Sequence, residues 1–358
     1  MSKSKLTLIV DGNWLMMSRL SVINNRYVDL KSSLHDLKLL LIKSINVVLR
    51  TFSDIDNIIF VTDGGSWRKY EDIPECLHHD LNGELVEYKG TRVKTDDIDW
   101  DMIFGSFDEF VNVLGENGIN VCSEHHVEGD DWCWYWSKKL NKNGTNVMLW
   151  SKDRDLTQLV HTDPTSKCFT VWWNKDNGVF TEQLNTDETD ELTWLFNLES
   201  KENDRILTNI LNKVHKKTYI NPYEIVVDKI FMGDMSDNIF PLLLRRARDI
   251  NNTKKFRINK KDLKLDIDIN DNNVVRDYIN SFYNMNNYSS RLINDANDEY
   301  EHFLYNKKLV WLDESSYPKE ILEQMQKYDI TNISKDCSVA ESVIQAEAQN
   351  MNDLLETI

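Results

Sequence analysis

Two short stretches of the sequence concentrate carboxylates beside apolar runs. Residues 128–131 read EGDD and residues 151–155 read SKDRD, which together carry five acidic side chains. Two like charges about 4 Å apart repel each other by about 4 kcal/mol at an effective dielectric constant of about 20. Bound cations offset such repulsion, and carboxylate oxygens are the ligands that magnesium prefers in proteins. The two stretches therefore indicate a site for divalent ions.

The acids of these stretches belong to a wider pattern, because carboxylates stand at four junctions where a predicted strand ends or a predicted helix begins. These residues are Asp11, Asp63, Glu128, Asp130, Asp131, Asp153 and Asp155. In an open parallel sheet the carboxyl ends of the strands share one edge, where ligands bind, so we expect the acids to converge there. A single Asp after a strand is ordinarily a cap or turn residue. Capping alone explains four acidic junctions poorly.

A later segment, IVVDKIFMGDMSDNIF, adds Asp234 and Asp237. Their i, i+3 spacing places both side chains on one side of a helical turn. Magnesium is the ion that fits such hard oxygen ligands best. Two divalent ions about 4 Å apart activate a water and stabilise the leaving oxygen in phosphodiester cleavage. The acids thus point to metal-dependent hydrolysis of nucleic acid.

The elements that must position these acids alternate between strand and helix patterns. Buried strands are predicted at LTLIVDGN, NIIFVTDGG, NVMLWSKD and CFTVWW, a strand or strand pair at GINVCSEHHV, and helices at LHDLKLLLIKSINVVLRTF, at residues 100–114 and at GDDWCWYWSKKLNK. This alternation predicts an α/β fold with a mostly parallel central sheet flanked by helices. The β-like runs stop near residue 186. We therefore predict a catalytic α/β domain at 1–185 and a mainly helical C-terminal domain at 186–358.

Composition excludes several classes of protein. A chain of 358 residues with 41% hydrophobic residues and eleven Trp is globular. No run of eighteen apolar residues is present, which argues against a membrane span, and the N-terminus does not resemble a signal peptide. Five scattered cysteines without CxxC spacing indicate free thiols in a reducing cytoplasm. The pairs His78–His79 and His125–His126 lack partners at zinc-ligand spacing, so zinc is not expected.

The net charge of −17 has the wrong sign for a simple nucleic-acid coat, but the charge is unevenly distributed. Residues 241–261 carry eight basic residues and one acid. Such a run is either a solvated surface or a strip that grips a phosphate backbone.

Six pieces of the chain, taken in order, resemble the motifs of the flap endonuclease or 5′-nuclease family. They are IVDGN, FVTDGGSWR, EYKGTR, VEGDD, SKDRDLTQL and KIFMGDMSDNI, and they span residues 6–240. The chain is most similar to the phage branch, especially the ribonuclease H type of T-even phages, and NKKLVWLDESSYP adds a looser likeness. The resemblance implies a PIN-like fold with a helical arch around residues 85–115 that threads the 5′ strand.

The resemblance also implies roles for individual residues. The first metal site would use Asp11, Asp63, Glu128, Asp130 and Asp131, and the second would use Asp153, Asp155, Asp234 and Asp237. Catalytic roles are implied for Asp63, Asp155, Lys89 and Arg92, the last two contacting the scissile phosphate at the base of the arch. Contacts to nucleic acid are implied for Arg68, for Tyr88 by stacking on a base, for Lys89 and Arg92, and for a basic strip of Arg245, Arg246, Arg248, Lys254 and Lys255.

Simpler interpretations stand beside these roles. Lys89 and Arg92 are solvated in the alternative interpretation, and Tyr88 is a half-buried packing residue. The aromatic cluster Trp132, Trp134 and Trp136 is expected to pack in the core rather than to stack on bases. The C-terminal stretch SVAESVIQAEAQNMNDLLETI has helical spacing, and it docks either on the core of this chain or on a replication partner such as a single-strand binding protein or a sliding clamp.

The family usually places a glycine-rich hairpin after its last acids, where backbone groups hold potassium against duplex phosphates. No glycine occurs here from residue 234 to residue 261, so a potassium site is doubtful. The basic strip would substitute by plain Coulombic contacts, which predicts a steep dependence of DNA binding on salt.

The expected function is a magnesium-dependent 5′→3′ exonuclease and flap endonuclease with RNase H-type activity, for which manganese substitutes. It would act on DNA and RNA–DNA hybrids, removing RNA primers or 5′ flaps during phage DNA replication in the host cytoplasm. One alternative is a PIN-type endoribonuclease, against which YKGTR and GDMSDN both count. The other is a catalytically inactive DNA-binding relative, which is disfavoured because every expected carboxylate is present.

Overall fold

The computed structural model describes most of the chain. The described residues are 5–23, 30–77, 87–90, 99–163, 168–175, 177–182, 201–244, 262–285, 292–328 and 335–355.

The chain forms two compact units, each of which we describe by itself. Unit 1 comprises Met1–Gly65, Thr95–Ile220 and Glu323–Ile358, and unit 2 comprises Ser66–Lys94 and Asn221–Leu322. This division differs from the predicted boundary near residue 185. The sheet of unit 1 takes a further strand from beyond that position, and its helical layer takes the C-terminal helix. Unit 2 in turn uses an early segment of the chain to complete its core.

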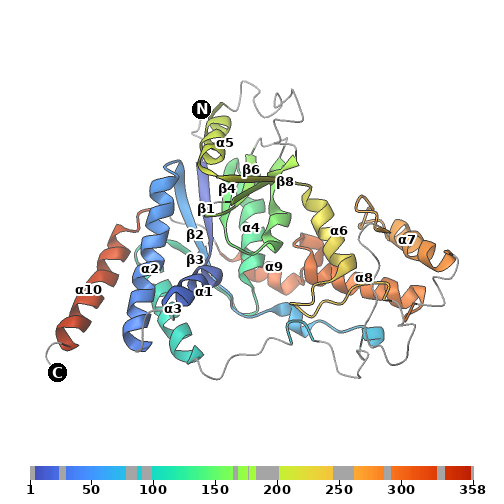
Figure 1. Ribbon diagram of the computed structural model, residues 1–358, viewed down its shortest axis with the longest axis horizontal. Coiled ribbons are helices and arrows are strands. Elements are labelled where there is room, and N and C mark those ends of the chain that lie inside the picture. Colours follow the sequence, from blue (N-terminus) through green and yellow to red (C-terminus); the bar gives the residue numbers. More distant parts are fainter. Residues whose placement is uncertain are drawn as a thin grey trace. The chain divides into compact units, whose positions relative to one another are not determined.

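Unit 1 is built on one mixed sheet with the order β3-β2-β1-β4-β6-β7-β8, and β5 pairs with β6 (Figure 1). The strands are β1 (Lys5–Asp11), β2 (Ile55–Val61), β3 (Asn120–Cys122), β4 (Thr145–Trp150), β5 (His161–Asp163), β6 (Cys168–Asn174), β7 (Asn177–Thr181) and β8 (Lys216–Ile220). Neighbouring strands from β3 through β6 are parallel, β7 and β8 are parallel to each other, and β6 is antiparallel to β5 and β7. The predicted mostly parallel sheet with flanking helices is confirmed.

Helices account for most of the remaining described structure. They are α1 (Gly12–Ile23), α2 (Leu30–Thr51), α3 (Trp100–Glu116), α4 (Gly129–Lys142), α5 (Lys201–Lys213), α6 (Pro222–Met232), α7 (Asn272–Asn284), α8 (Ala296–Val310), α9 (Lys319–Gln326) and α10 (Ser338–Leu355). Short 3₁₀ helices are η1 (Trp67–Tyr70), η2 (Glu75–Leu77), η3 (Asp155–Leu159) and η8 (Glu314–Ser316). No helix among the described residues is both long and apolar enough to span a bilayer.

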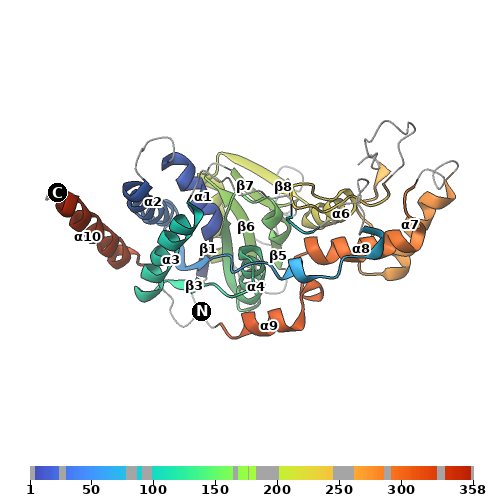
Figure 2. The same ribbon diagram turned by 90° about the horizontal axis from the view of Figure 1, so that it is seen from below.

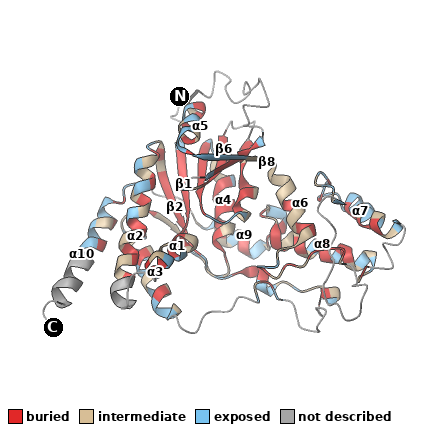
Figure 3. Ribbon diagram, viewed as in Figure 1, coloured by how far each residue is buried: buried red, intermediate tan, exposed pale blue. Residues whose placement is uncertain are grey.

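The strand β1 is buried on both faces because helices cover both sides of the sheet (Figure 3). Leu6, Leu8 and Val10 alternate along the strand and therefore line one face of the sheet. They join a core cluster with residues of α1, α2 and α3. The helix α4 packs against β1 and β4 on the other side, and Figure 2 shows α3 and α4 on opposite sides of β1. Continuous apolar runs are what strands covered on both faces require.

Two predictions about packing in unit 1 are confirmed. The aromatic side chains of Trp132, Trp134 and Trp136 on α4 are buried, as a core role requires. The C-terminal helix α10 packs on α2 of this chain, with Ala340 and Ile344 fully buried in the same core cluster. One alternative for the C-terminal stretch, docking on its own core, therefore applies.

The prediction that strands stop near residue 186 is wrong, because β8 follows α5 and pairs in parallel with β7. Its sequence, KKTYI, begins with two lysines, and its first three residues are exposed. A strand at the edge of a sheet needs no continuous apolar run, and charged side chains protect such an edge from pairing with other chains. The segment GINVCSEHHV forms only the short strand β3.

Unit 2 has its own core of α6, α7 and α8. Phe231 on α6 contacts Phe303 on α8, with ring centroids 5.7 Å apart, and Phe282 on α7 is buried in the same cluster. The ring of Tyr88 also belongs to this cluster. All five cysteines of the chain are free thiols, as predicted.

Candidate functional site

Asp11, the last residue of β1, is buried and held by two hydrogen bonds. The backbone N–H of Trp14 donates to its Oδ1 at 3.0 Å, and the hydroxyl of Ser151 donates to its Oδ2 at 2.6 Å. Burial raises the pKa of Asp11 to about 7, although the hydrogen bond from Ser151 opposes the change. The charges of Asp63 and Asp153 raise it further. Asp11 is thus a buried carboxylate that needs either a proton or a cation.

Asp63 follows β2 and is fixed by groups from two other elements. Its backbone N–H donates to Oδ1 of Asn13 at 3.0 Å, and its own Oδ1 accepts from the N–H of Gly129 at 2.6 Å. A Cβ atom at position 129 would lie 3.0 Å from the same Oδ1, which is tighter than nearly all real contacts. The glycine of EGDD therefore allows the carboxylate of Asp63 to approach the start of α4.

The N-terminus of α4 presents three acids. Glu128 is the N-cap residue, and its backbone N–H donates to Oδ2 of Asp131 at 3.0 Å in a capping box. Glu128 and Asp131 are buried, whereas Asp130 is partly exposed. The positive end of the helix dipole and its unpaired N–H groups stabilise negative charge here. The fold therefore compensates part of the repulsion among these acids and of that from Asp63.

The residues after β4 arrange Asp153 and Asp155. The hydroxyl of Ser151 accepts the N–H of Asp153 at 2.9 Å, and Oδ1 of Asp153 accepts the N–H of Asp155 at 2.9 Å. Because Ser151 also donates to Asp11, one buried hydroxyl links the acid that ends β1 with the acids that follow β4. Asp155 then begins η3.

The charges of four of these acids raise the pKa of one buried thiol on α4, that of Cys133. The pKa of the Cys133 thiol is raised well above its usual value, first by burial and then by the charges of Asp11, Asp130, Asp63 and Asp153. The predicted convergence of acids from separate strands is therefore present in unit 1. Among the described residues of this unit, however, no three side chains bring one ligand atom each within 4.8 Å of one another. The ligand atoms that these acids offer are carboxylate oxygens, the type of ligand that magnesium prefers.

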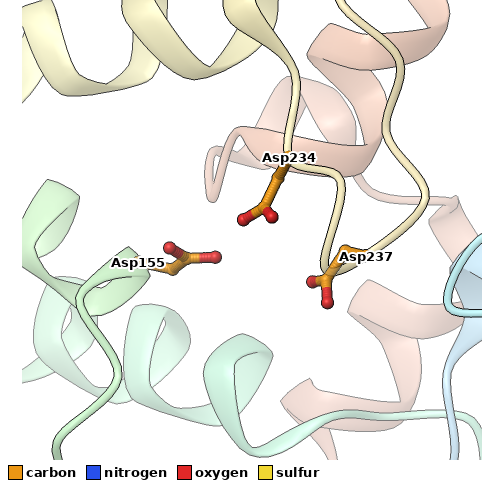
Figure 4. A group of neighbouring side chains, drawn as sticks. All are labelled: Asp155, Asp234 and Asp237. Carbon is orange, nitrogen blue, oxygen red and sulfur yellow. The ribbon is translucent and has the colours of Figure 1, made fainter. Parts of the chain in front are cut away.

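In unit 2, Asp234 and Asp237 lie on a turn rather than on a helix (Figure 4). The turn follows α6, which ends at Gly233 with φ of 68°, and the N–H of Asp237 donates to the carbonyl of Asp234 at 3.1 Å. The two side chains bring a carboxylate oxygen each within 4.8 Å of one another. The predicted pairing at i, i+3 is therefore correct although the local structure differs.

Asp234 has its own counter-ion. Lys229 on α6 places its Nζ 2.8 Å from Oδ2, and the hydroxyl and the N–H of Ser236 donate to Oδ1 at 2.6 Å and 2.9 Å. Burial alone would raise the pKa of Asp234, but these partners lower it to about 2. Asp234 is therefore ionised at every physiological pH.

Lys89 lies in a turn at residues 87–90 that is joined to the acidic turn of unit 2. The backbone N–H of Lys89 donates to the carbonyl of Asp237 at 2.8 Å, and Nδ2 of Asn238 donates to the carbonyl of Glu87 at 2.9 Å. Lys89 and Asn238 both adopt positive φ, 57° and 60°. Asn tolerates this conformation better than most residues. The lysine predicted to contact phosphate is thus held beside Asp237.

Two predicted contacts to nucleic acid are wrong for the same reason, which is burial. The guanidinium of Arg68 is enclosed in unit 2, where Nε donates to the carbonyl of Leu309 at 2.9 Å and Cζ lies 4.5 Å from the ring centre of Trp67. Tyr88 is only 7% exposed and packs in the core of unit 2, so the packing alternative applies to it.

Part of the predicted arch is also a core element. The helix α3 buries Ile103, Phe107, Phe110 and Leu114 against the sheet layer of unit 1, as its amphipathic spacing dictates. Other predicted residues lie outside the described part of the chain, namely Arg92, Arg245, Arg246, Arg248, Lys254, Lys255, His78 and His79. Neither His125 nor His126 joins a group of metal-ligand atoms among the described residues.

The structure adds positioning residues that the sequence interpretation passed over. They are Asn13, Ser151, Lys229 and Asn238, each hydrogen-bonded or ion-paired within the acidic segments. All four stand inside the quoted motifs IVDGN, SKDRDLTQL and KIFMGDMSDNI. A short polar side chain directly beside a functional acid is the signal that would have found them, since it can bond to a neighbouring backbone group.

Comparison with known proteins gives similar structures but no sequence match. No protein-family model matches the chain, and no curated protein matches it. The chain is similar to a flap endonuclease of bacteriophage T5 in a complex with DNA and metal ions, at 17% identity and a TM-score of 0.45, covering 94% of this chain and 100% of that chain. It is also similar to the T5 5′-exonuclease with bound zinc, at 18% identity and a TM-score of 0.46, covering 92% and 99%.

Proposed function

We propose that the chain is a magnesium-dependent 5′-nuclease that cleaves phosphodiester bonds near free 5′ ends or flaps of DNA and RNA–DNA hybrids. The observation that carries the proposal is the buried carboxylate of Asp11, whose two hydrogen bonds offset only part of the cost of its charge. It is buried at the carboxyl edge of a parallel sheet, and Asp63 and Asp153 raise its pKa further to about 7. A soluble protein gains nothing in stability from such an arrangement, whereas a divalent cation relieves it.

Magnesium supplies the activation of water and the stabilisation of the leaving oxygen in this class of reaction. The acids of unit 1 would hold it as hard oxygen donors, and Asp234 and Asp237 offer a second carboxylate pair in unit 2. Manganese prefers the same donors and is expected to substitute. A potassium site remains doubtful because residues 234–261 lack the glycines of the usual phosphate-binding hairpin.

The described residues of the chain supply positioning and charge. Ser151 orients Asp11 and the segment of Asp153, and the start of α4 orients Asp63. Lys89, fixed by its backbone to the carbonyl of Asp237, would place a cation against the scissile phosphate. The ordered motifs from IVDGN to GDMSDN support a 5′-nuclease over a simpler PIN-type endoribonuclease. Removal of RNA primers or flaps in phage replication is the role that the resemblance to phage enzymes favours.

The test uses a 5′-labelled flap and a nicked RNA–DNA hybrid with the full chain, with and without Mg²⁺. The variant Asp155→Asn removes one charge at the start of η3, and the matched control Asp56→Asn makes the same change near the amino end of β2, at the opposite edge of the sheet. We expect metal-dependent release of short 5′ products, lost in Asp155→Asn and retained in Asp56→Asn. Binding without cleavage in both Mg²⁺ and Mn²⁺ would refute the nuclease and leave an inactive binding module.

A further inference from the structure

A concave pocket lies in unit 1 between α1, α2 and the ends of β4 and β6. It has a volume of about 380 Å³. Ligand pockets usually measure about 300–1,000 Å³, so this one has the size for a single small molecule or one nucleotide, not for a peptide helix. None of the acids assigned to the metal edge lines it.

The floor of this pocket is aromatic. It is lined by Trp14, Trp150 and Trp173, which contact each other in sequence, with ring centroids 6.0 Å apart for the first pair and 5.8 Å apart for the second. The indole N–H of Trp173 is buried and has no hydrogen-bond partner in the structure. That donor is enclosed by protein atoms, so the contact that this floor offers a ligand is the apolar surface of the indoles.

The rim of the pocket is basic. Arg19, Lys43 and Lys175 line it, and none of its lining residues, all of which are described, is acidic. This is notable in a chain with 59 acidic and 42 basic residues, a net charge of −17. The hydroxyl of Ser44 accepts the Nε–H of Arg19 at 2.8 Å, which holds that guanidinium at the pocket. A cationic ligand is therefore disfavoured and an anionic one is attracted.

We propose that this pocket binds one nucleotide, with the base against the indoles and the phosphate against Lys43, Lys175 and Arg19. Flat aromatic rings are the groups that Trp side chains bind best by stacking or edge contacts. The amide of Asn174, which also lines the pocket, offers a donor and an acceptor for the edge of a base. The ligand is either a free nucleoside monophosphate or one nucleotide of a strand, because both offer one base and one phosphate.

The test is calorimetric titration of the full chain with a nucleoside monophosphate, and separately with a short oligothymidylate, in EDTA. The chelator removes divalent ions, so cleavage and metal-dependent binding do not contribute, and the variants below separate this pocket from metal-independent contacts to a strand. A negative result here therefore leaves the nuclease proposal untouched. We expect one site per chain in at least one titration. Tighter binding of the mononucleotide identifies the free ligand, and tighter binding of the oligonucleotide identifies a strand.

The double variant Lys43→Gln, Lys175→Asn should weaken binding at least tenfold, because two of the three rim charges are removed. Asn is chosen at position 175 because Lys175 has φ of 49°, which Asn tolerates. The control Lys142→Gln changes an exposed lysine in the last turn of α4, on the other side of the sheet, and should bind as the parent does. Trp14→Leu should also weaken binding while inorganic phosphate affinity stays unchanged. Absence of binding in both titrations at millimolar ligand, equal affinity in the double variant, or equal affinity for inorganic phosphate alone would each overturn the proposal.

Discussion

Ser151 gives the sharpest test of how the acidic edge is organised. Its side chain is fully buried, donates to Asp11 and accepts from the N–H of Asp153. The change Ser151→Ala removes a hydrogen bond to a carboxylate, which contributes about 1.5–3 kcal/mol. This energy corresponds to a roughly ten- to hundredfold change in an ionisation equilibrium. The pKa of Asp11 should therefore rise further above about 7.

The consequence for metal binding follows from competition between the proton and the cation for Asp11. At pH 7 Ser151→Ala should need a roughly ten- to hundredfold higher concentration of Mg²⁺ for half-maximal cleavage than the parent chain does, by the same conversion. At pH 9 the deficit should shrink, because deprotonation of Asp11 then costs less. Cleavage of a 5′-labelled flap is followed over a Mg²⁺ titration at both pH values.

The matched control is Ser137→Ala on α4. Ser137 is also buried, but its hydroxyl has no hydrogen-bond partner, so the same substitution removes no bond. It should leave the Mg²⁺ requirement unchanged. The reasoning fails if Ser151→Ala has the parent's Mg²⁺ midpoint, if Ser137→Ala shifts the midpoint equally, or if the deficit is the same at pH 7 and pH 9.

Three further substitutions test other parts of the account. Asp11→Asn should abolish cleavage yet stabilise the metal-free protein at pH 8 by on the order of 4 kcal/mol in chemical denaturation. The folded pKa of about 7 lies above the ordinary value of 3.8, so the carboxyl group destabilises the fold increasingly as pH rises between those values; equal stability of the two proteins at pH 8 would contradict this. Asn238→Gly should lose about 1 kcal/mol with the bond to Glu87, and Asn238→Ala about 1 kcal/mol more because of its positive φ; thermal melts that rank Ala above Gly would refute the conformational argument. Arg68→Lys should destabilise the fold by about 2–3 kcal/mol through the lost hydrogen bond to Leu309, without changing the DNA affinity of the folded protein. Weaker DNA binding with unchanged stability would instead support the predicted contact between Arg68 and phosphate.

The acidic edge could be predicted from sequence because each acid lies next to the strand or helix that positions it. Each acid directly follows an apolar strand or begins a helix, as Asp11, Asp63 and Glu128 do, and a parallel sheet brings such positions to one edge. The same local rules predicted α4, whose capping residues and aromatic spacing are visible in GDDWCWYW. What the sequence could not supply was how far burial raises the pKa of Asp11.

The failures share a non-local cause. Arg68 stands in a motif that suggests a phosphate contact, but its partner is the carbonyl of Leu309, 241 positions away. Tyr88 is buried by residues of α6 to α8, and the sequence around Tyr88 does not indicate these contacts. The strand β8 was missed because an edge position tolerates exposed lysines, and the boundary near residue 185 failed because it assumed that each unit is one continuous segment.

The two groups of acids differ in how far the protein itself neutralises them, and this difference has a chemical consequence. Asp234 has Lys229 as a counter-ion and a pKa of about 2, so it offers a permanent charge. Asp11 accepts hydrogen bonds from Trp14 and Ser151, and its pKa is about 7. At neutral pH a fraction of the Asp11 side chains carries a proton, which a divalent ion must displace. An ion bound by Asp234 must instead compete with Lys229. Metal binding at the edge of unit 1 should accordingly strengthen as pH rises through 7, and binding at the acidic turn of unit 2 should depend little on pH between 5 and 9.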